Sequence, residues 1–171
     1  ILVGPEGDGG RLLVLRSDGA VEPRFEVVAD TRLALPMGAP FNGARNLVQV
    51  GDVDGDGLPD LVLLAADGHL AVITNSGDAE DPLPASRLVS LSSPKPSILA
   101  FALLDADADH LTDDLLLVVG TPPTGDLPAT SQVRRGRIAG AEIVRPEDPL
   151  PVEVNDVIST ATQIVAADFD G

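Results

Sequence analysis

Four aspartates lie close enough together in one short segment to bind a metal ion. They occupy positions 1, 3, 5 and 9 of a predicted tight loop and are Asp52, Asp54, Asp56 and Asp60. Because alternate residues of such a loop point to one side, the first three carboxylates are expected to converge. Carboxylates this close stay ionised only when a cation neutralises them. The all-oxygen donor set favours a hard ion, and a flexible loop suits Ca²⁺ better than Mg²⁺.

The other residues of this loop are consistent with a metal site. Gly57, at position 6, permits a positive φ that turns the loop back on itself, and the backbone carbonyl of Leu58 is a further candidate ligand. The loop is not an EF-hand, which places a glutamate at position 12, because Leu63 stands there. The alternative interpretation is a solvated acidic turn that keeps strand edges from pairing with other chains.

The pattern recurs twice. Its second copy gives the candidate ligands Asp105, Asp107, Asp109, the carbonyl of Leu111, and Asp113. His110 replaces the glycine of position 6 there, so a positive φ is more costly. The third copy reaches only Asp168 and Asp170, which makes a partial site. We therefore expect two complete Ca²⁺ sites.

Short apolar segments flank these loops and have the length and composition of strands. They are rich in Val, Leu and Ile and are bounded by Gly, Pro and Asp-Gly turns. Hairpins are predicted around Asp18-Gly19 and Asp67-Gly68. One repeat unit is predicted to contain strands at 47–51, 61–66, 69–74 and 87–91, and the next at 98–104, 115–120, 131–138 and 141–145. Four strands per repeat match one blade of a β-propeller.

Composition excludes several classes of function. The 171 residues carry a formal charge of −16, which disfavours a nucleic-acid partner. There is no cysteine, so thiol chemistry and disulfides are absent. No apolar run approaches the roughly 18 residues that a membrane-spanning helix needs, so membrane insertion is not expected.

The acidic loop followed by an apolar strand resembles the FG-GAP/VCBS repeat family, which includes the integrin α-subunit head. The match is Asp52-x-Asp54-x-Asp56-Gly57-x-x-Asp60, and Gly120-Thr121-Pro122 resembles the family's Gly-Ala-Pro. The resemblance implies an all-β fold of four-stranded antiparallel propeller blades that bind Ca²⁺ in the hairpin between their first two strands. His110 and the lack of a clear Phe-Gly signature depart from the family pattern.

The repeats divide the chain into parts of one propeller domain, residues 1–171. We expect a partial blade at 1–45 (strands 2–4), blades at 46–96 and 97–158, and the first strand and start of the calcium loop of another blade at 159–171. Because propellers have about 4–8 blades, the chain is expected to be a piece of a larger, roughly seven-bladed ring. The alternative is that a strand at 162–167 joins residues 1–30 and that chains pair to close the ring.

Three functions are compatible with this pattern. The first is a Ca²⁺-stabilised, non-catalytic module that binds another protein or a cell-surface ligand, in an extracellular, cell-surface or periplasmic location. The second is a spacer propeller inside a larger secreted enzyme or toxin. The third, an enzyme, is disfavoured because His69 and His110 lie in different repeats. The basic segment 134–137 is either a dock for an anionic ligand or, more commonly, an intra-chain charge partner or exposed strand edge.

Overall fold

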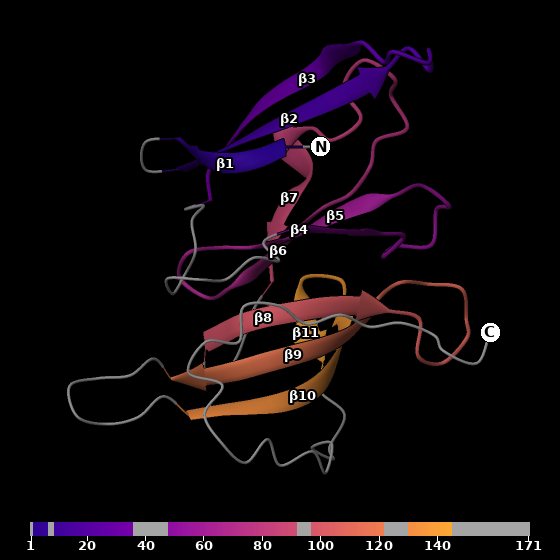
Figure 1. Cartoon of the computed structure of the whole chain (residues 1–171). Coiled ribbons are helices and arrows are strands. Elements are labelled where there is room, and N and C mark those ends of the chain that lie inside the picture. The colour runs from indigo at the N-terminus through magenta and orange to yellow at the C-terminus, as the bar shows by residue number, and fades with distance from the viewer. Residues whose placement is uncertain (1, 7–8, 36–47, 92–96, 122–129, 145–171) are drawn as a thin grey trace.

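The fold of this chain consists of antiparallel strands. The computed structural model describes residues 2–6, 9–35, 48–91, 97–121 and 130–144 (Figure 1). In these ranges the one helical element is a short 3₁₀ turn, η1 (Ala85–Arg87). The prediction of an all-β chain is therefore confirmed. None of the described helical segments has the length and apolar character needed to cross a membrane.

Eleven strands in the described ranges form three sheets, and in each sheet the strands pair antiparallel in sequence order. The first sheet contains β1 (Leu2–Glu6), β2 (Gly9–Ser17) and β3 (Phe25–Leu33). The second contains β4 (Val48–Gly51), β5 (Asp60–Leu64), β6 (Leu70–Ile73) and β7 (Leu88–Ser90). The third contains β8 (Ser97–Leu104), β9 (Asp114–Thr121), β10 (Thr130–Ala139) and β11 (Glu142–Val144).

The eight strands predicted for the two complete repeats are all present, with ends that differ by at most two residues from the prediction. The turn at Asp67-Gly68 is tight, with Gly68 at φ 82° and a hydrogen bond from the Ala65 N–H to the His69 carbonyl. The hairpin at Asp18-Gly19 is present but wider than expected, because β3 starts only at Phe25. The Asp18 carboxylate accepts the N–H groups of Ala20 and Arg24 and so closes this longer loop.

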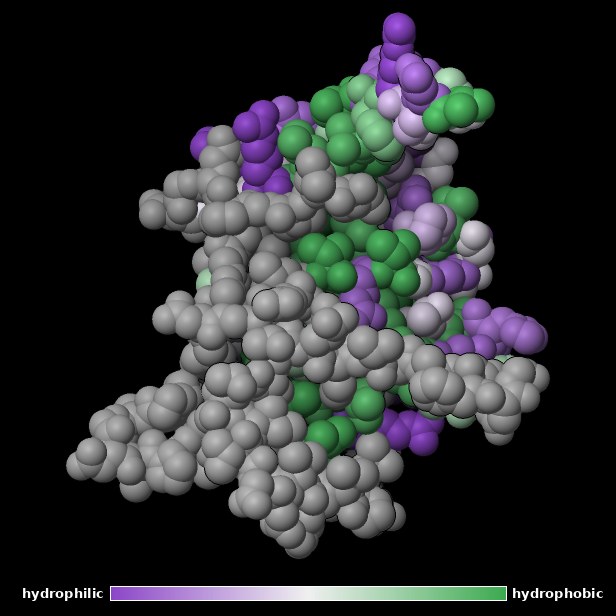
Figure 2. Space-filling view, viewed as in Figure 1, coloured by the Kyte–Doolittle hydropathy of each residue, from purple (hydrophilic) through white to green (hydrophobic). Residues whose placement is uncertain are grey.

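The three sheets are stacked in layers, with the second sheet in the middle (Figure 1). Strand β5 is buried along its whole length, and its side chains alternate between two hydrophobic clusters. Leu61 and Leu63 pack toward the first sheet, against Leu12 and Leu33. Figure 2 shows hydrophobic side chains between the layers and hydrophilic ones along the outer margins.

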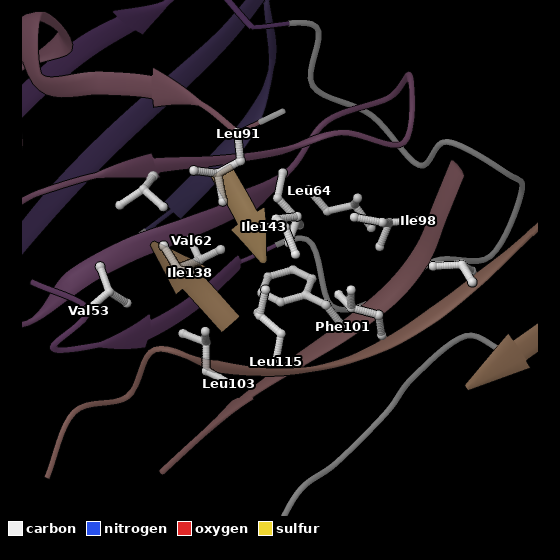
Figure 3. Close-up of a cluster of buried hydrophobic side chains, with 14 residues drawn as sticks. Val53, Val62, Leu64, Leu91, Ile98, Phe101, Leu103, Leu115, Ile138 and Ile143 are labelled. Atoms are coloured by element: carbon white, nitrogen blue, oxygen red, sulfur yellow. The ribbon is translucent and has the colours of Figure 1, made fainter. Parts of the chain in front are cut away.

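The opposite face of β5 packs toward the third sheet. Val62 and Leu64 join a cluster that includes Phe101 and Leu115 (Figure 3). A continuous apolar strand is typical of a sheet covered on both faces, which explains the unbroken run of hydrophobic residues in the sequence. The described residues form stacked sheets without a closed ring, so the propeller remains a proposal.

A glutamine joins the second and third sheets through hydrogen bonds. The Gln49 side chain on β4 donates to the carbonyl of Phe101 (2.9 Å) and accepts the N–H of Leu103 (2.8 Å). Both partners lie on β8, the first strand of the third sheet. This amide therefore fixes the position of β8 relative to β4, the two strands that lead into the acidic loops.

Candidate metal centre

The first acidic loop connects β4 to β5, and its two ends are held together by the sheet. Gly51 ends β4 and lies opposite Asp60, the first residue of β5. Between them Gly55 and Gly57 both have φ of 81°, a conformation that residues with side chains rarely adopt. The positive φ predicted for Gly57 is confirmed, and that of Gly55 is a second requirement of the same turn.

The Asp52 carboxylate organises the interior of this loop. It accepts the N–H of Gly55 at 2.8 Å with one oxygen and the N–H of Gly57 at 2.9 Å with the other. Asp54 and Asp56 make shorter-range contacts, each accepting the N–H two residues further along the chain. The loop is thereby folded around its own carboxylates.

Asp60 is fully buried, unlike the exposed Asp54 and Asp56. Its two oxygens accept the N–H groups of Val53 (2.9 Å) and Asn75 (2.7 Å). Burial raises the pKa of Asp60 above its ordinary value, and the nearby charges of Asp54 and Asp56 add to this, while the two hydrogen bonds act in the opposite direction. Asn75 was not identified from the sequence, since no local spacing relates it to Asp60.

Three of the four predicted aspartates come together. Asp52, Asp54 and Asp60 each bring one carboxylate oxygen to within 4.8 Å of the others. Asp56 stands outside this group, with its Oδ1 committed to the N–H of Leu58. Among the described residues no arginine, lysine or histidine forms an ion pair with these carboxylates. The donor set, all oxygen and uncompensated, fits a hard cation such as Ca²⁺.

The second acidic loop, between β8 and β9, has a similar backbone without glycine. Ala108 (φ 59°) and His110 (φ 71°) are the non-glycine residues with positive φ in the described ranges, and they stand where the first loop has Gly55 and Gly57. The Asp105 carboxylate accepts the N–H of Asp109 and of His110. The histidine therefore adopts the turn that glycine makes in the first loop.

The second loop places a different aspartate at the start of its strand. Asp114 is the first residue of β9, lies opposite Leu104, and accepts the N–H of Ala106 at 2.9 Å. Asp60 likewise begins its strand and accepts the N–H of the equivalent residue, Val53, so Asp114, one residue beyond the predicted Asp113, holds the matching position. Asp105, Asp107 and Asp109 form a second group of oxygens within 4.8 Å.

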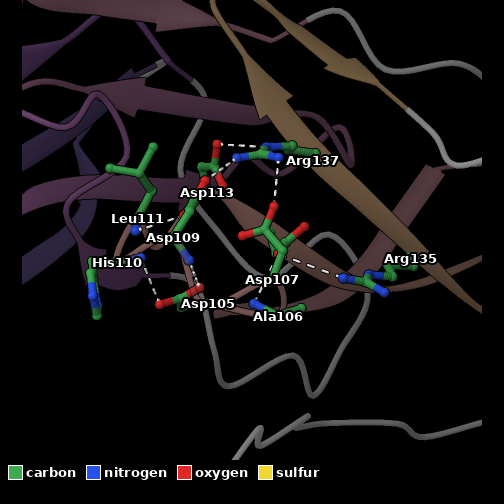
Figure 4. Close-up of polar contacts among 10 residues, drawn as sticks. Asp105, Ala106, Asp107, Asp109, His110, Leu111, Asp113, Arg135 and Arg137 are labelled. Atoms are coloured by element: carbon green, nitrogen blue, oxygen red, sulfur yellow. Dashed lines mark hydrogen bonds and ion pairs between the residues drawn. The ribbon is translucent and has the colours of Figure 1, made fainter.

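Arg137 on β10 binds two members of this group, Asp107 and Asp109, together with Asp113 (Figure 4). Its guanidinium donates to Asp113 (Nε, 2.8 Å), Asp107 (Nη1, 2.9 Å) and Asp109 (Nη2, 2.7 Å). Arg135 lies 3.7 Å from Asp114. The interpretation of the basic segment as an intra-chain charge partner is therefore confirmed for both of these arginines.

The two acidic loops touch each other. The N–H of Thr112 donates to the carbonyl of Asp52 at 2.7 Å. A Cβ added to Gly51 would lie 2.7 Å from the Thr112 Cβ, and one added to Gly55 would lie 3.1 Å from the Leu111 side chain. The two candidate metal-binding loops thus form one contiguous surface at the same end of their sheets.

The remaining residues that the sequence analysis singled out are located as follows. Asp168 and Asp170 lie outside the described residues. The carbonyls of Leu58 and Leu111 remain predicted ligands. His69 is exposed and its Nδ1 lies 3.2 Å from Asp67 within the turn before β6.

Comparisons of this chain with protein-family models, with curated proteins and with solved structures give no match.

Proposed function

We propose that this chain is a calcium-stabilised, non-catalytic β-module, formed of propeller blades, that binds another protein or a cell-surface ligand. The observation that supports this proposal most directly is that carboxylate oxygens of Asp52, Asp54 and Asp60 lie within 4.8 Å of one another. Among the described residues no basic side chain forms an ion pair with them. Two acidic loops that lie against each other at one end of the stacked sheets support a recognition surface there.

Calcium would act here as a structural ion. Asp60 begins β5, which is buried along its whole length, while Asp52 and Asp54 lie in the loop, so an ion bound to all three would fasten the loop to the sheet. Its binding free energy would add to folding, by about 2.7 kcal/mol when free Ca²⁺ is 100 times the dissociation constant. Extracellular Ca²⁺ modules bind in the range of about 10⁻⁴–10⁻³ M, which is the range that the proposed extracellular location predicts for this chain.

The test is calorimetric titration of chelator-stripped protein with Ca²⁺, using Mg²⁺ as the competing ion. The informative variant is Asp54→Asn, which removes one negative charge but keeps an oxygen that can accept the N–H of Asp56. The matched control is Asp67→Asn, an exposed aspartate in the turn after β5, at the opposite end of that strand from Asp60.

We expect Ca²⁺ to bind the unaltered protein and the Asp67→Asn control equally, and the Asp54→Asn variant at least tenfold more weakly. Absence of Ca²⁺ binding to the folded protein would refute the proposal. Equal weakening by both substitutions would also refute the assignment to the first loop.

A further inference from the structure

The second acidic loop differs from the first because it contains a permanent positive charge. Arg137 uses three different nitrogens to bind three different carboxylates, those of Asp113, Asp107 and Asp109, at distances from 2.7 to 2.9 Å. A guanidinium is a rigid planar fork with a fixed set of donors, and it does not lose its proton in proteins. Such a group can occupy the position among several carboxylates that a cation would otherwise take.

The surroundings of Asp113 show why a charge is needed there. Asp113 is only 5% exposed, and its Oδ1 is buried without a hydrogen-bond partner. Its other oxygen is bound by Arg137. A buried carboxylate without a counter-charge is strongly destabilising, so the arginine compensates a charge that the fold has already removed from water.

Arg137 and Asp109 shift each other's pKa values in the directions that favour their charged forms. The carboxylates of Asp113 and Asp109 raise the pKa of Arg137 above its ordinary range. The pKa of Asp109 is lowered, first by the N–H of Leu111 and then by Arg137. Both shifts favour the fully ionised network.

Within the described ranges, the first loop has no arginine that binds its carboxylates. In the third sheet β10 extends to a position opposite Asp114, and Arg137 stands at that position. In the second sheet β6 pairs with β5 as far as Ile73, opposite Leu61, and the next residue is the uncharged Thr74. The two loops therefore differ in the charges that the third strand of each sheet supplies. In the third sheet Arg137 binds three carboxylates of the loop, and Arg135 lies against Asp114.

We propose that Arg137 takes the place of a metal ion in the second loop, so that the chain binds Ca²⁺ at the first loop only. The second loop is then complete without metal, and through Thr112 it supports the Asp52 end of the first loop in the calcium-free protein. The count of one ion rests on the proposed function, whereas the role of Arg137 does not.

The experiment counts bound Ca²⁺ by equilibrium dialysis in the unaltered protein, in Arg137→Gln and in a control, Arg134→Gln. Arg134 is on the same strand but contacts the side chain of Gln132 instead of the carboxylates. We expect one ion in the unaltered protein and in the control, and two in Arg137→Gln. Adding Asp107→Asn to the Arg137→Gln variant should remove the second ion.

The same count in an Asp54→Asn background separates this proposal from the proposed function. There the first loop is disabled, and Arg137→Gln should still gain one ion. Failure of the unaltered protein to bind Ca²⁺ would refute the proposed function, while this gain would still support the role of Arg137. A second ion in the unaltered protein, or no gain in Arg137→Gln, would overturn the role of Arg137.

A measurement on the unaltered protein covers the case in which the variant does not fold. In an NMR titration with Ca²⁺, the amide signals of Gly55 and Gly57 should shift to saturation. Those of Asp107 and Ala108 should show no saturating shift of their own. A separate saturating shift at Asp107 and Ala108 would overturn the proposal.

Discussion

At the scale of single residues, Asp60 combines a structural role with a proposed ligand role. Both of its oxygens accept backbone N–H groups, those of Val53 and Asn75, before any ion is considered. A carboxylate oxygen has a second lone pair, so each can bind an ion as well. The residue is buried at the start of β5, which makes its charge costly in the absence of Ca²⁺.

This predicts opposite pKa behaviour for Asp60 with and without calcium. In the calcium-free protein the pKa of Asp60 is raised above 3.8, chiefly by burial. The folded protein then holds that proton more tightly than the unfolded chain does. The stabilising contribution is fully present below pH 3.8 and is lost as pH rises through the raised pKa. Because Ca²⁺ binds the ionised form, saturating Ca²⁺ should move the pKa below 3.8.

Carboxyl-carbon NMR titration measures both states, with Asp18 as the internal control. Hydrogen bonds from the N–H groups of Ala20 and Arg24 lower the pKa of Asp18, so its contribution is lost as pH falls through that lowered value. Its pKa should not respond to Ca²⁺. If Asp60 titrated at or below 3.8 in calcium-free protein, the account of its burial would be wrong.

The sequence identified part of this site and missed residues that only the fold brings near. Asp52, Asp54 and Asp60 were predicted from local spacing, because loop residues a few positions apart converge. Arg137 lies far along the chain from the loop it neutralises and is brought there by the pairing of β10 with β9. The repeat alignment selected Asp113 as the equivalent of Asp60, whereas the register of the sheet places Asp114 at the start of β9.

At the scale of elements, the two acidic loops are expected to be coupled through the contact of Gly51 with Thr112. Gly51→Ala would place a Cβ 2.7 Å from the Thr112 Cβ, too close for either to remain in place. We expect a loss of about 1–3 kcal/mol in the free energy of unfolding, together with weaker Ca²⁺ binding. Combining it with Thr112→Gly removes the clashing atoms, so a double-mutant cycle by denaturant unfolding should show recovery. Strictly additive losses would contradict the coupling.

A second prediction at this scale concerns the link between sheets. Gln49→Ala would leave the Phe101 carbonyl and the Leu103 N–H without their side-chain partner. Each unpaired buried group costs about 1–3 kcal/mol, so unfolding by urea should show a loss of about 2 kcal/mol or more. The control Gln132→Ala removes an exposed amide whose oxygen accepts hydrogen bonds from the Arg134 side chain. That change should stay within about 0.5 kcal/mol, and equal losses would contradict the role of Gln49.

Strands were the most predictable elements, because short Val- and Leu-rich runs between Gly and Asp turns have few alternatives. The exception is the β2–β3 hairpin, where the Asp-Gly signal is present but Asp18 closes a longer loop with the N–H of Arg24. The Asp18 carboxylate accepts the N–H two residues further along the chain and the N–H six residues further along, so the same side chain can close either a short or a long loop. The spacing of polar residues alone did not distinguish between them.

At the scale of the whole molecule, the second sheet lies between the first and the third and shares a hydrophobic cluster with each. Because both faces of β5 are buried, loss of either neighbouring sheet would expose it. The layered arrangement supports the proposed blades, and the sequence predicted the strands of each layer. The order in which the sheets stack was less predictable. An apolar strand such as β5 indicates that both faces of its sheet are covered, but it does not indicate which sheet covers each face.

This arrangement predicts that the core is sensitive at Phe101 and tolerant at Phe25. Phe101 is fully buried between the second and third sheets, whereas Phe25 is 65% exposed. Phe101→Ala should lower the free energy of unfolding by about 3–5 kcal/mol, and Phe25→Ala by about 0.5 kcal/mol or less. Circular dichroism melts of both variants provide the comparison, and similar melting temperatures would contradict the packing described.

The most direct test of the calcium proposal is a crystal structure of this chain grown with millimolar Ca²⁺. We predict an ion at about 2.3–2.6 Å from oxygens of Asp52, Asp54 and Asp60, and the Arg137 guanidinium among Asp107, Asp109 and Asp113. A first loop without bound Ca²⁺ would contradict the calcium-stabilised module. An ion in the second loop with Arg137 displaced would contradict the assignment of that position to the arginine.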